Sequence, residues 1–203
     1  VDTLQEAFEA WIIRVAAYCL LPNYYHLLIM TPEGNIVRAM RHINGIYTQR
    51  FNRGHDYEGQ LFRGRYKSIV EGGDSYLLQL VRYIHANPVK AGLAEDAEHY
   101  AWSSHKAYLS TAKKWDWLYK SFILGLFADG RKVQLKAYRQ FMMDDEVDAV
   151  HEIMDRPNRP AALGTQNFLD WVKGKYYTLE KNNEKPRARE FRPPAEKITL
   201  DVC

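Results

Sequence analysis

The spacing of hydrophobic residues changes along the first part of the chain in a way that predicts alternating helices and strands. Apolar residues recur at helical spacing over 2–9, so we expect a short helix there. A continuous apolar and aromatic run over 11–21 predicts a buried strand, and 24–30 predicts a second strand. Pro22 and Asn23 favour a turn between the two strands. The pair therefore predicts a β-hairpin.

Three further elements follow before residue 90. Apolar positions spaced three or four apart predict an amphipathic helix over 35–52. The stretch 60–70, interrupted by Gly64, predicts a strand or hairpin arm, and 76–87 predicts a helix that Pro88 should end. This order of helices and strands predicts an α+β fold whose sheet is covered by helices on one face.

The pattern becomes mainly helical beyond Trp102, and the last part of the chain is charged and contains several prolines. We therefore expect a first domain over 1–110, a helical extension over 111–180, and a linker or tail over 181–203. The helical segments within the extension are expected over 117–127, 132–143, 147–154 and 167–177.

Composition narrows the class of protein. No apolar run is long enough to span a membrane, and the first residues lack the pattern of a secretory signal, so we expect a cytoplasmic protein. Cys19 and Cys203 stand far apart in the sequence and suggest neither a disulfide framework nor a zinc knuckle. The sequence leaves the oligomeric state open.

Positive charge is concentrated in one stretch of the sequence. Between positions 34 and 70 there are seven basic residues and two acidic ones, a local net charge of +5 in a chain whose total is +3. Aromatic residues alternate with these cations, a mixture typical of proteins that bind single-stranded nucleic acid. A solvated helix face followed by a polar hairpin would give the same pattern. The charged side chains in question include Arg38, Arg41, Arg63, Arg65 and Lys67.

Two pairs of side chains could support phosphate chemistry. Tyr24 and His26 are two apart in a predicted strand and share a face, while Tyr83 and Asn87 are four apart in a predicted helix and share a side. A phenol can attack phosphorus if a divalent metal stabilises the developing charge, and a histidine nitrogen with an amide oxygen could hold Mg²⁺ or Mn²⁺. The same residues could equally be a core histidine, a packing tyrosine and a helix cap.

Four ordered blocks of sequence resemble a known family. Together they are similar to the REP-associated tyrosine transposases, single-tyrosine relatives of small insertion-sequence transposases in the His-hydrophobic-His superfamily. The blocks are distributed along the first domain, and they are YCLLPNYYHLLI at 18–29, GQLFRGRYKS at 59–68, RYIHANPVKAGL at 82–93 and YAWSS at 100–104.

The resemblance implies a ferredoxin-like antiparallel sheet and a metal-dependent endonuclease that cuts single-stranded DNA beside hairpins. Tyr83 matches the nucleophile that becomes linked to a 5′ phosphate, and His26 and Asn87 match metal ligands. Tyr24 stands where the family has its first histidine; because a phenol is the poorer ligand, we expect weaker metal binding. The family's first strand would precede the helix that begins near Asp2.

We expect the basic stretch to hold the DNA strand, with Arg38, Arg41, Arg63, Arg65 and Lys67 as the contacting residues. The main hypothesis is therefore a transposase acting on single-stranded or hairpin DNA with a divalent metal. A second hypothesis is a protein that binds DNA hairpins on the same scaffold but has lost cleavage with the change at Tyr24. A third is an RNA-binding α+β module.

Overall fold

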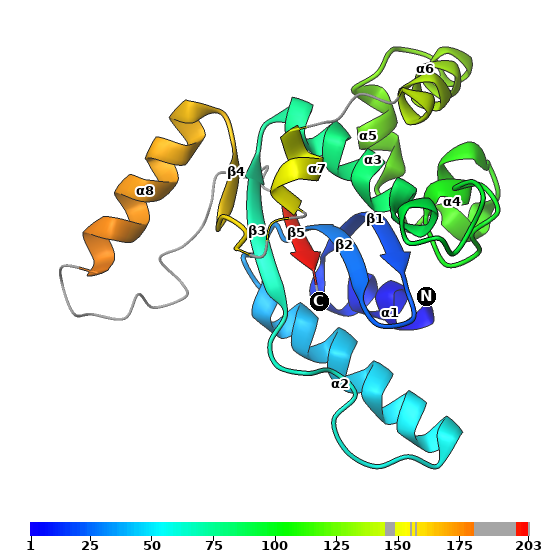
Figure 1. The fold of residues 1–203 in the computed structure, drawn as a ribbon, viewed down its shortest axis with the longest axis vertical. Coiled ribbons are helices and arrows are strands. Elements are labelled where there is room, and N and C mark those ends of the chain that lie inside the picture. Colours follow the sequence, from blue (N-terminus) through cyan, green and yellow to red (C-terminus); the bar gives the residue numbers. More distant parts are fainter. Residues whose placement is uncertain (145–148, 155, 157, 181–197, 203) are drawn as a thin grey trace.

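The computed structural model describes residues 1–144, 149–154, 156, 158–180 and 198–202. Helices and strands alternate along the chain, as expected of an α+β protein (Figure 1). The elements are α1 Asp2–Trp11, β1 Arg14–Leu20, β2 Tyr25–Met30, α2 Ile36–His55, β3 Lys67–Gly72, α3 Asp74–Lys90, α4 His105–Leu109, the 3₁₀ helix η1 Lys113–Trp115, α5 Lys120–Gly125, α6 Arg131–Met143, α7 Ala149–Met154, β4 Ala162–Gly164, α8 Gln166–Glu180 and β5 Ile198–Val202.

The predicted hairpin is present as β1 and β2. The two strands pair antiparallel, with His26 opposite Cys19. The N–H of Leu21 donates to the carbonyl of Tyr24 at 2.8 Å, which closes the turn and makes β2 begin one residue later than predicted. Trp11 belongs to α1 rather than to β1, because the helix continues until Ile12 takes a left-handed conformation with φ 53°.

The sheet is larger than the sequence predicted, and it is mixed. Its strand order is β1-β2-β5-β3-β4, with β5 antiparallel to both neighbours and β4 parallel to β3. The last two strands come from the C-terminal half, so the expectation of a purely helical extension is not confirmed. The ferredoxin-like topology and the domain boundaries stay predictions.

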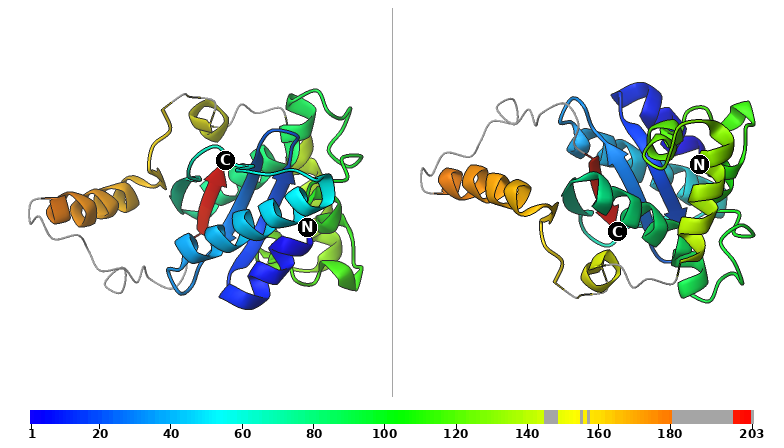
Figure 2. Two further views of the ribbon diagram at one scale, coloured as in Figure 1. Left: turned by 90° about the horizontal axis from the view of Figure 1, so that it is seen from below. Right: turned by 90° about the horizontal axis from the view of Figure 1, so that it is seen from above.

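The prediction that helices cover one face of the sheet is wrong, because helices pack on both faces (Figure 2). Side chains of α3, α5, α6 and α7 share one hydrophobic core with the face of β2 that carries Leu28. Side chains of α1 and α2 share a second core with the face that carries Leu27. Burial on both sides explains why β1 reads as a continuous apolar run rather than an alternating one.

The helix α3 passes through Pro88 instead of ending before it. It extends from Asp74 to Lys90, and the N–H of Ala91 donates to the carbonyl of Asn87 at 2.9 Å. Pro88 lies in the last turn and is buried, so its packing offsets the single donor that a proline removes. The prediction that Pro88 ends the helix is therefore wrong.

The strand expected over 60–70 is shorter than predicted. β3 begins at Lys67, and the residues before it form an exposed irregular segment in which Gly59 and Gly64 have positive φ angles. The predicted tail lies mostly outside the described residues, except for 198–202, which form β5. In the part of the chain that the structure describes, every helix is too short or too polar to cross a membrane.

Candidate functional site

The structure brings together the two residue pairs singled out in the sequence. His26 is on β2, Tyr83 and Asn87 are on α3, and α3 packs on the sheet face to which His26 points. The ring centroids of His26 and Tyr83 are 5.2 Å apart, and those of His26 and Tyr24 are 5.3 Å apart. The hydroxyl of Tyr24 donates to Oδ1 of Asn87 at 3.2 Å. We call these four residues the open cluster.

His26 is buried in an unusual way. Its side chain is 1% exposed, and among the described residues neither ring nitrogen has a hydrogen-bond partner. Burial, together with the positive charge of Arg159, lowers the pKa of His26 from 6.5 to about 3, so the imidazole is neutral at pH 7. A neutral imidazole has a lone pair on one nitrogen, which is the form that binds a metal ion.

A second polar cluster lies on another side of the same helix. His85, two residues after Tyr83, is fully buried, and its ring nitrogens contact Ser104 Oγ at 2.7 Å and Tyr138 Oη at 2.8 Å. Tyr138 Oη also lies 2.6 Å from Nδ1 of His105. We call His85, Ser104, His105 and Tyr138 the closed cluster. Because both of its ring nitrogens are bound there, His85 does not contribute to the open cluster.

His42 also lies away from the open cluster. It is on α2, which covers the opposite face of the sheet, and its ring contacts Trp11 at a centroid distance of 6.0 Å. Two residues that sequence reasoning missed do lie near the open cluster. The ring of His151, on α7, is 5.2 Å from that of Tyr83, and the charge of Arg159 acts on His26.

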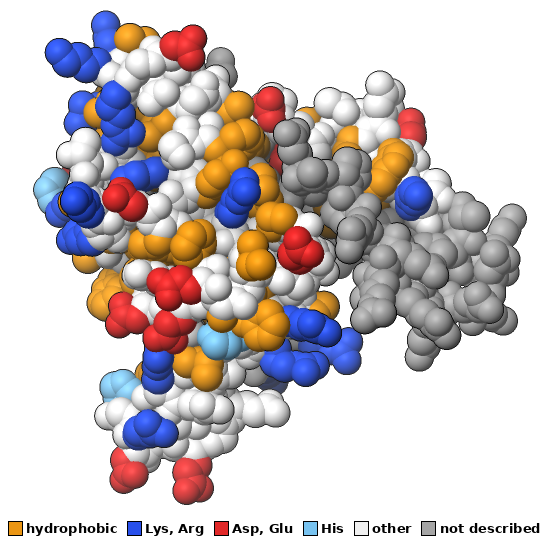
Figure 3. Space-filling view, turned by 180° about the vertical axis from the view of Figure 1, so that it is seen from behind, with side chains coloured by type: hydrophobic (Ala, Val, Ile, Leu, Met, Phe, Trp, Pro, Cys, Tyr) orange, Lys and Arg blue, Asp and Glu red, His pale blue; other side chains and the backbone are white. Residues whose placement is uncertain are grey.

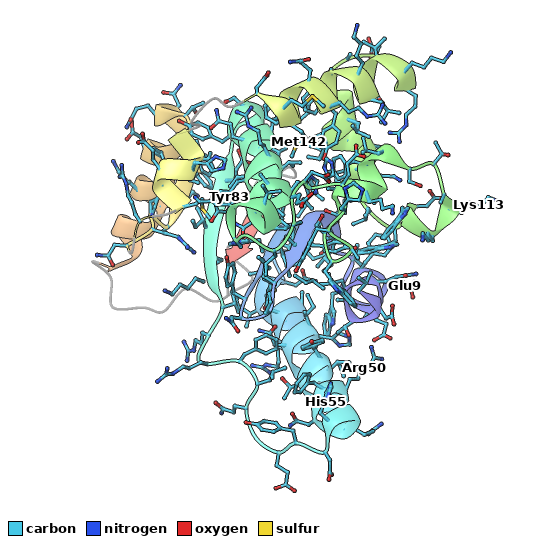
Figure 4. All side chains as sticks on the ribbon, turned by 45° about the vertical axis from the view of Figure 1, so that its right-hand side comes forward. Glu9, Arg50, His55, Tyr83, Lys113 and Met142 are labelled. Atoms are coloured by element: carbon cyan, nitrogen blue, oxygen red, sulfur yellow. The ribbon has the colours of Figure 1, made fainter. Side chains whose placement is uncertain are left out.

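Figure 4 shows Tyr83 on α3 beside α7, with the sheet beneath it. The spacing within 147–154 predicted a helix but carried no signal of where that helix packs. The contact between His151 and Tyr83 therefore depends on a long-range arrangement that local sequence could not indicate. Lys90, one turn after Asn87, places its ammonium group 5.8 Å from the centre of the Tyr83 ring.

The predicted DNA-binding residues separate into two groups. Lys67 begins β3, and the register places it opposite Val202 of β5, which in turn lies opposite His26. Lys67 alternates with buried Ile69, which packs in the α3 core, so Lys67 and His26 belong to the same face of the sheet. Arg63 and Arg65 are exposed in the segment that leads into this strand.

Arg38 and Arg41 are exposed on α2, which covers the other face of the sheet, so the structure does not bring them to the open cluster. Arg50, which contributes to the same basic stretch of sequence, is bound to α1, where it pairs with Glu6 at 2.8 Å. Figure 3 shows Lys and Arg side chains gathered beside apolar ones on one face of the molecule.

An aromatic pocket of about 370 Å³ adjoins the hairpin turn. Rings of Tyr24, Tyr25, Tyr47, Phe51 and Phe62 line part of it. Tyr24 therefore contributes to this pocket and also donates to Asn87 of the open cluster. Exposed rings next to cations can stack on unpaired bases.

Comparison with known families adds one finding. Residues 2–87, less than half of the chain, match a family model described as "Transposase IS200 like". The match supports the transposase family, and with it DNA binding, DNA cleavage and DNA transposition. The matched segment ends at Asn87, so it includes the whole open cluster and excludes His151 and Arg159. No curated protein and no solved structure matches the chain.

Proposed function

We propose that the protein is a metal-dependent transposase that cleaves single-stranded or hairpin DNA with Tyr83 as its nucleophile. The observation that carries this proposal is the convergence of His26, Tyr83 and Asn87, drawn from two distant elements, around a histidine whose ring nitrogens are both unpaired among the described residues. The match to the IS200-like family supports the same function. The finer assignment to the REP-associated subtype rests on the four sequence blocks.

The open cluster fits a divalent metal by the chemistry of its donors. A buried imidazole without a partner is costly unless something outside the chain binds it, and Asn87 offers a carbonyl oxygen nearby. His26 and Asn87 would hold the ion, with Tyr24 as a weaker ligand. When bound, Mg²⁺ or Mn²⁺ would polarise the phosphate and stabilise its developing negative charge.

The residues of the chain account for the remaining steps. The phenol oxygen of Tyr83 attacks phosphorus and loses its proton; the bond between phosphorus and the 3′ oxygen breaks, and that oxygen takes a proton. The products are a 5′-phosphotyrosine and a free 3′ hydroxyl. The ammonium of Lys90, 5.8 Å from the centre of the Tyr83 ring, adds positive charge beside the nucleophile.

Lys67, on the face of the sheet that carries the open cluster, would contact phosphates together with Arg63 and Arg65 in the segment before it. The aromatic pocket lies mainly on the opposite face, beside α1 and α2, and would stack unpaired bases of a strand that passes Tyr24 at the hairpin turn. Base stacking of this kind would favour single strands, because paired bases in a duplex cannot reach the rings. Arg38 and Arg41 would contact DNA only if the substrate extends around the edge of the sheet.

The test is the covalent intermediate itself. We expect the protein to form a DNA adduct that survives denaturation when it is incubated with Mn²⁺ and a hairpin-bearing single-stranded oligonucleotide. Tyr83→Phe should abolish the adduct, whereas Tyr76→Phe, a matched change two turns earlier on α3, should leave it intact. An adduct that persists in Tyr83→Phe would refute the assignment of the nucleophile.

One contact favours a second candidate function, a protein that binds DNA hairpins but cleaves them poorly. The hydroxyl of Tyr24 donates to the amide oxygen of Asn87, which is the atom needed to bind the metal. If this bond competes with the metal, Tyr24→His should raise both the affinity for Mn²⁺ and the yield of adduct. Rapid cleavage by the unaltered protein would exclude this candidate. A binding competition between RNA and DNA hairpins of the same sequence distinguishes it from an RNA-binding protein.

A further inference from the structure

His151 lies outside the segment that matches the transposase family, yet its side chain contacts Tyr83. The two ring centroids are 5.2 Å apart with an interplanar angle of 70°. His26 meets the same phenol at 5.2 Å and 69°. Tyr83 is therefore contacted edge-to-face by one imidazole from β2 and by another from α7.

The position of His151 is set by the core rather than by its own contact with Tyr83. Val150 and Met154, its neighbours on α7, are fully buried in the same hydrophobic cluster as Tyr83. The backbone after the helix is also held, because Nε of Arg159 donates to the carbonyl of Met154 at 2.8 Å. A change confined to the ring of His151 should therefore leave α7 in place.

We propose that His151 is a positioning residue, whose ring holds the phenol of Tyr83 in the orientation that faces His26. The proposal rests on the proposed function for the role of Tyr83, but the contact itself can be tested without any reaction. A tyrosine at 4% exposure that is fixed before substrate binds loses less freedom in reaching the transition state. Edge-to-face contacts are strong enough to change the population of such an orientation up to about tenfold.

The experiment compares variants of the full chain that keep or remove the aromatic ring. His151→Phe keeps a flat ring, while His151→Leu keeps the bulk and a good helix former but loses the ring. His99→Ala is the control, since that histidine is exposed and pairs with its near neighbour Asp96. A fluorine-labelled tyrosine at position 83 reports the environment of the phenol by ¹⁹F NMR, and adduct formation and DNA affinity are measured in parallel.

We expect His151→Leu to shift and narrow the fluorine resonance and to slow adduct formation by up to about tenfold, with DNA affinity unchanged. In His151→Phe the fluorine resonance should keep the position and width that it has in the unaltered protein, and the rate of adduct formation should stay within about twofold. An unshifted resonance in His151→Leu, or an equal loss of rate in both variants, would overturn the positioning role. A resonance that responds as expected in a protein that never forms the adduct would support the positioning role and reject the proposed function.

Discussion

The open and closed clusters use similar side chains and meet at the same helix, α3, but their buried polar atoms differ in whether they have hydrogen-bond partners. In the closed cluster, both ring nitrogens of His85 lie within hydrogen-bond distance of hydroxyl groups, and Tyr138 bridges to His105. In the open cluster, His26 is as deeply buried, yet neither nitrogen has a partner among the described residues. A satisfied buried network stabilises a fold, whereas an unsatisfied one costs free energy.

This difference suggests different roles for the two clusters. The closed cluster joins α3 to α4 and α6, and we interpret it as the connection that holds α3, the helix that carries Tyr83, against the rest of the chain. Under the proposed function, the open cluster keeps the ring nitrogens of His26 available for a metal ion. Histidine and tyrosine content alone would rank the two clusters equally, and only their hydrogen bonds distinguish them.

The largest effect should come from breaking the closed cluster. His85→Ala removes a fully buried ring and leaves the hydroxyls of Ser104 and Tyr138 without this partner. We expect the free energy of unfolding to fall by about 3 to 5 kcal/mol. Urea unfolding measures it, with His99→Ala as an exposed control that should change it by less than about 0.5 kcal/mol. A loss below about 1 kcal/mol in His85→Ala would mean that the network is not structural.

The matching change in the open cluster should have the opposite effect on stability. His26→Leu replaces an unpaired buried imidazole with an apolar side chain of similar size, so the metal-free protein should keep its stability or gain about 1 kcal/mol. Adduct formation in Mn²⁺ should be lost. If His26→Leu destabilises the protein as much as His85→Ala does, the contrast between the clusters is wrong.

Acid should lower the free energy of unfolding through the buried histidines. Burial lowers the pKa of His85 and His105 in the folded protein below the ordinary 6.5, as it does for His26, so all three stay neutral while the unfolded chain takes up protons. Stability is therefore full above pH 6.5 and falls as the pH drops below it, by up to about 1.4 kcal/mol per pH unit for each histidine. Urea unfolding between pH 7 and pH 5 should show this slope. His105→Gln should reduce it; an unchanged slope would assign the loss to other groups.

The smallest effect concerns the surface beside the open cluster. Lys67 shares a sheet face with His26, so Lys67→Gln should weaken DNA binding modestly and lower the salt dependence of the affinity by about one ion. Lys136, exposed on α6, provides the control Lys136→Gln. Fluorescence anisotropy at several salt concentrations measures both. Equal salt dependence in the two variants would place the DNA elsewhere.

The local sequence pattern was sufficient to predict the hairpin and the helices α2 and α3. It also predicted which residues of the open cluster share a face of their strand or helix. Tyr24 and His26 share a strand face and Tyr83 and Asn87 share a helix side because those periodicities are fixed by backbone geometry. By the same helical periodicity, His85, two residues after Tyr83, faces another side of α3. The sequence also indicated that the sheet is buried on both faces, since the apolar run over 11–21 does not alternate with polar residues. The prediction that helices cover one face did not take this into account.

Long-range contacts account for what the sequence could not indicate. The pairing of β5 between β2 and β3 joins segments more than a hundred residues apart, and no local pattern specifies such a partner. The contact of His151 with Tyr83 is of the same kind. That Tyr24 and Asn87 lie near each other could be anticipated from the sequence. The hydrogen bond, in which the phenol donates to the amide oxygen, required coordinates.

Metal binding tests the central claim, that His26 is unpaired because it is a ligand, more directly than any other measurement. Titration of Mn²⁺ followed by electron paramagnetic resonance should show one site in the unaltered protein that is absent from His26→Leu and retained in His99→Ala. Tyr24→His should tighten the same site. Equal Mn²⁺ binding by the unaltered protein and His26→Leu would contradict the account and leave the open cluster without a function.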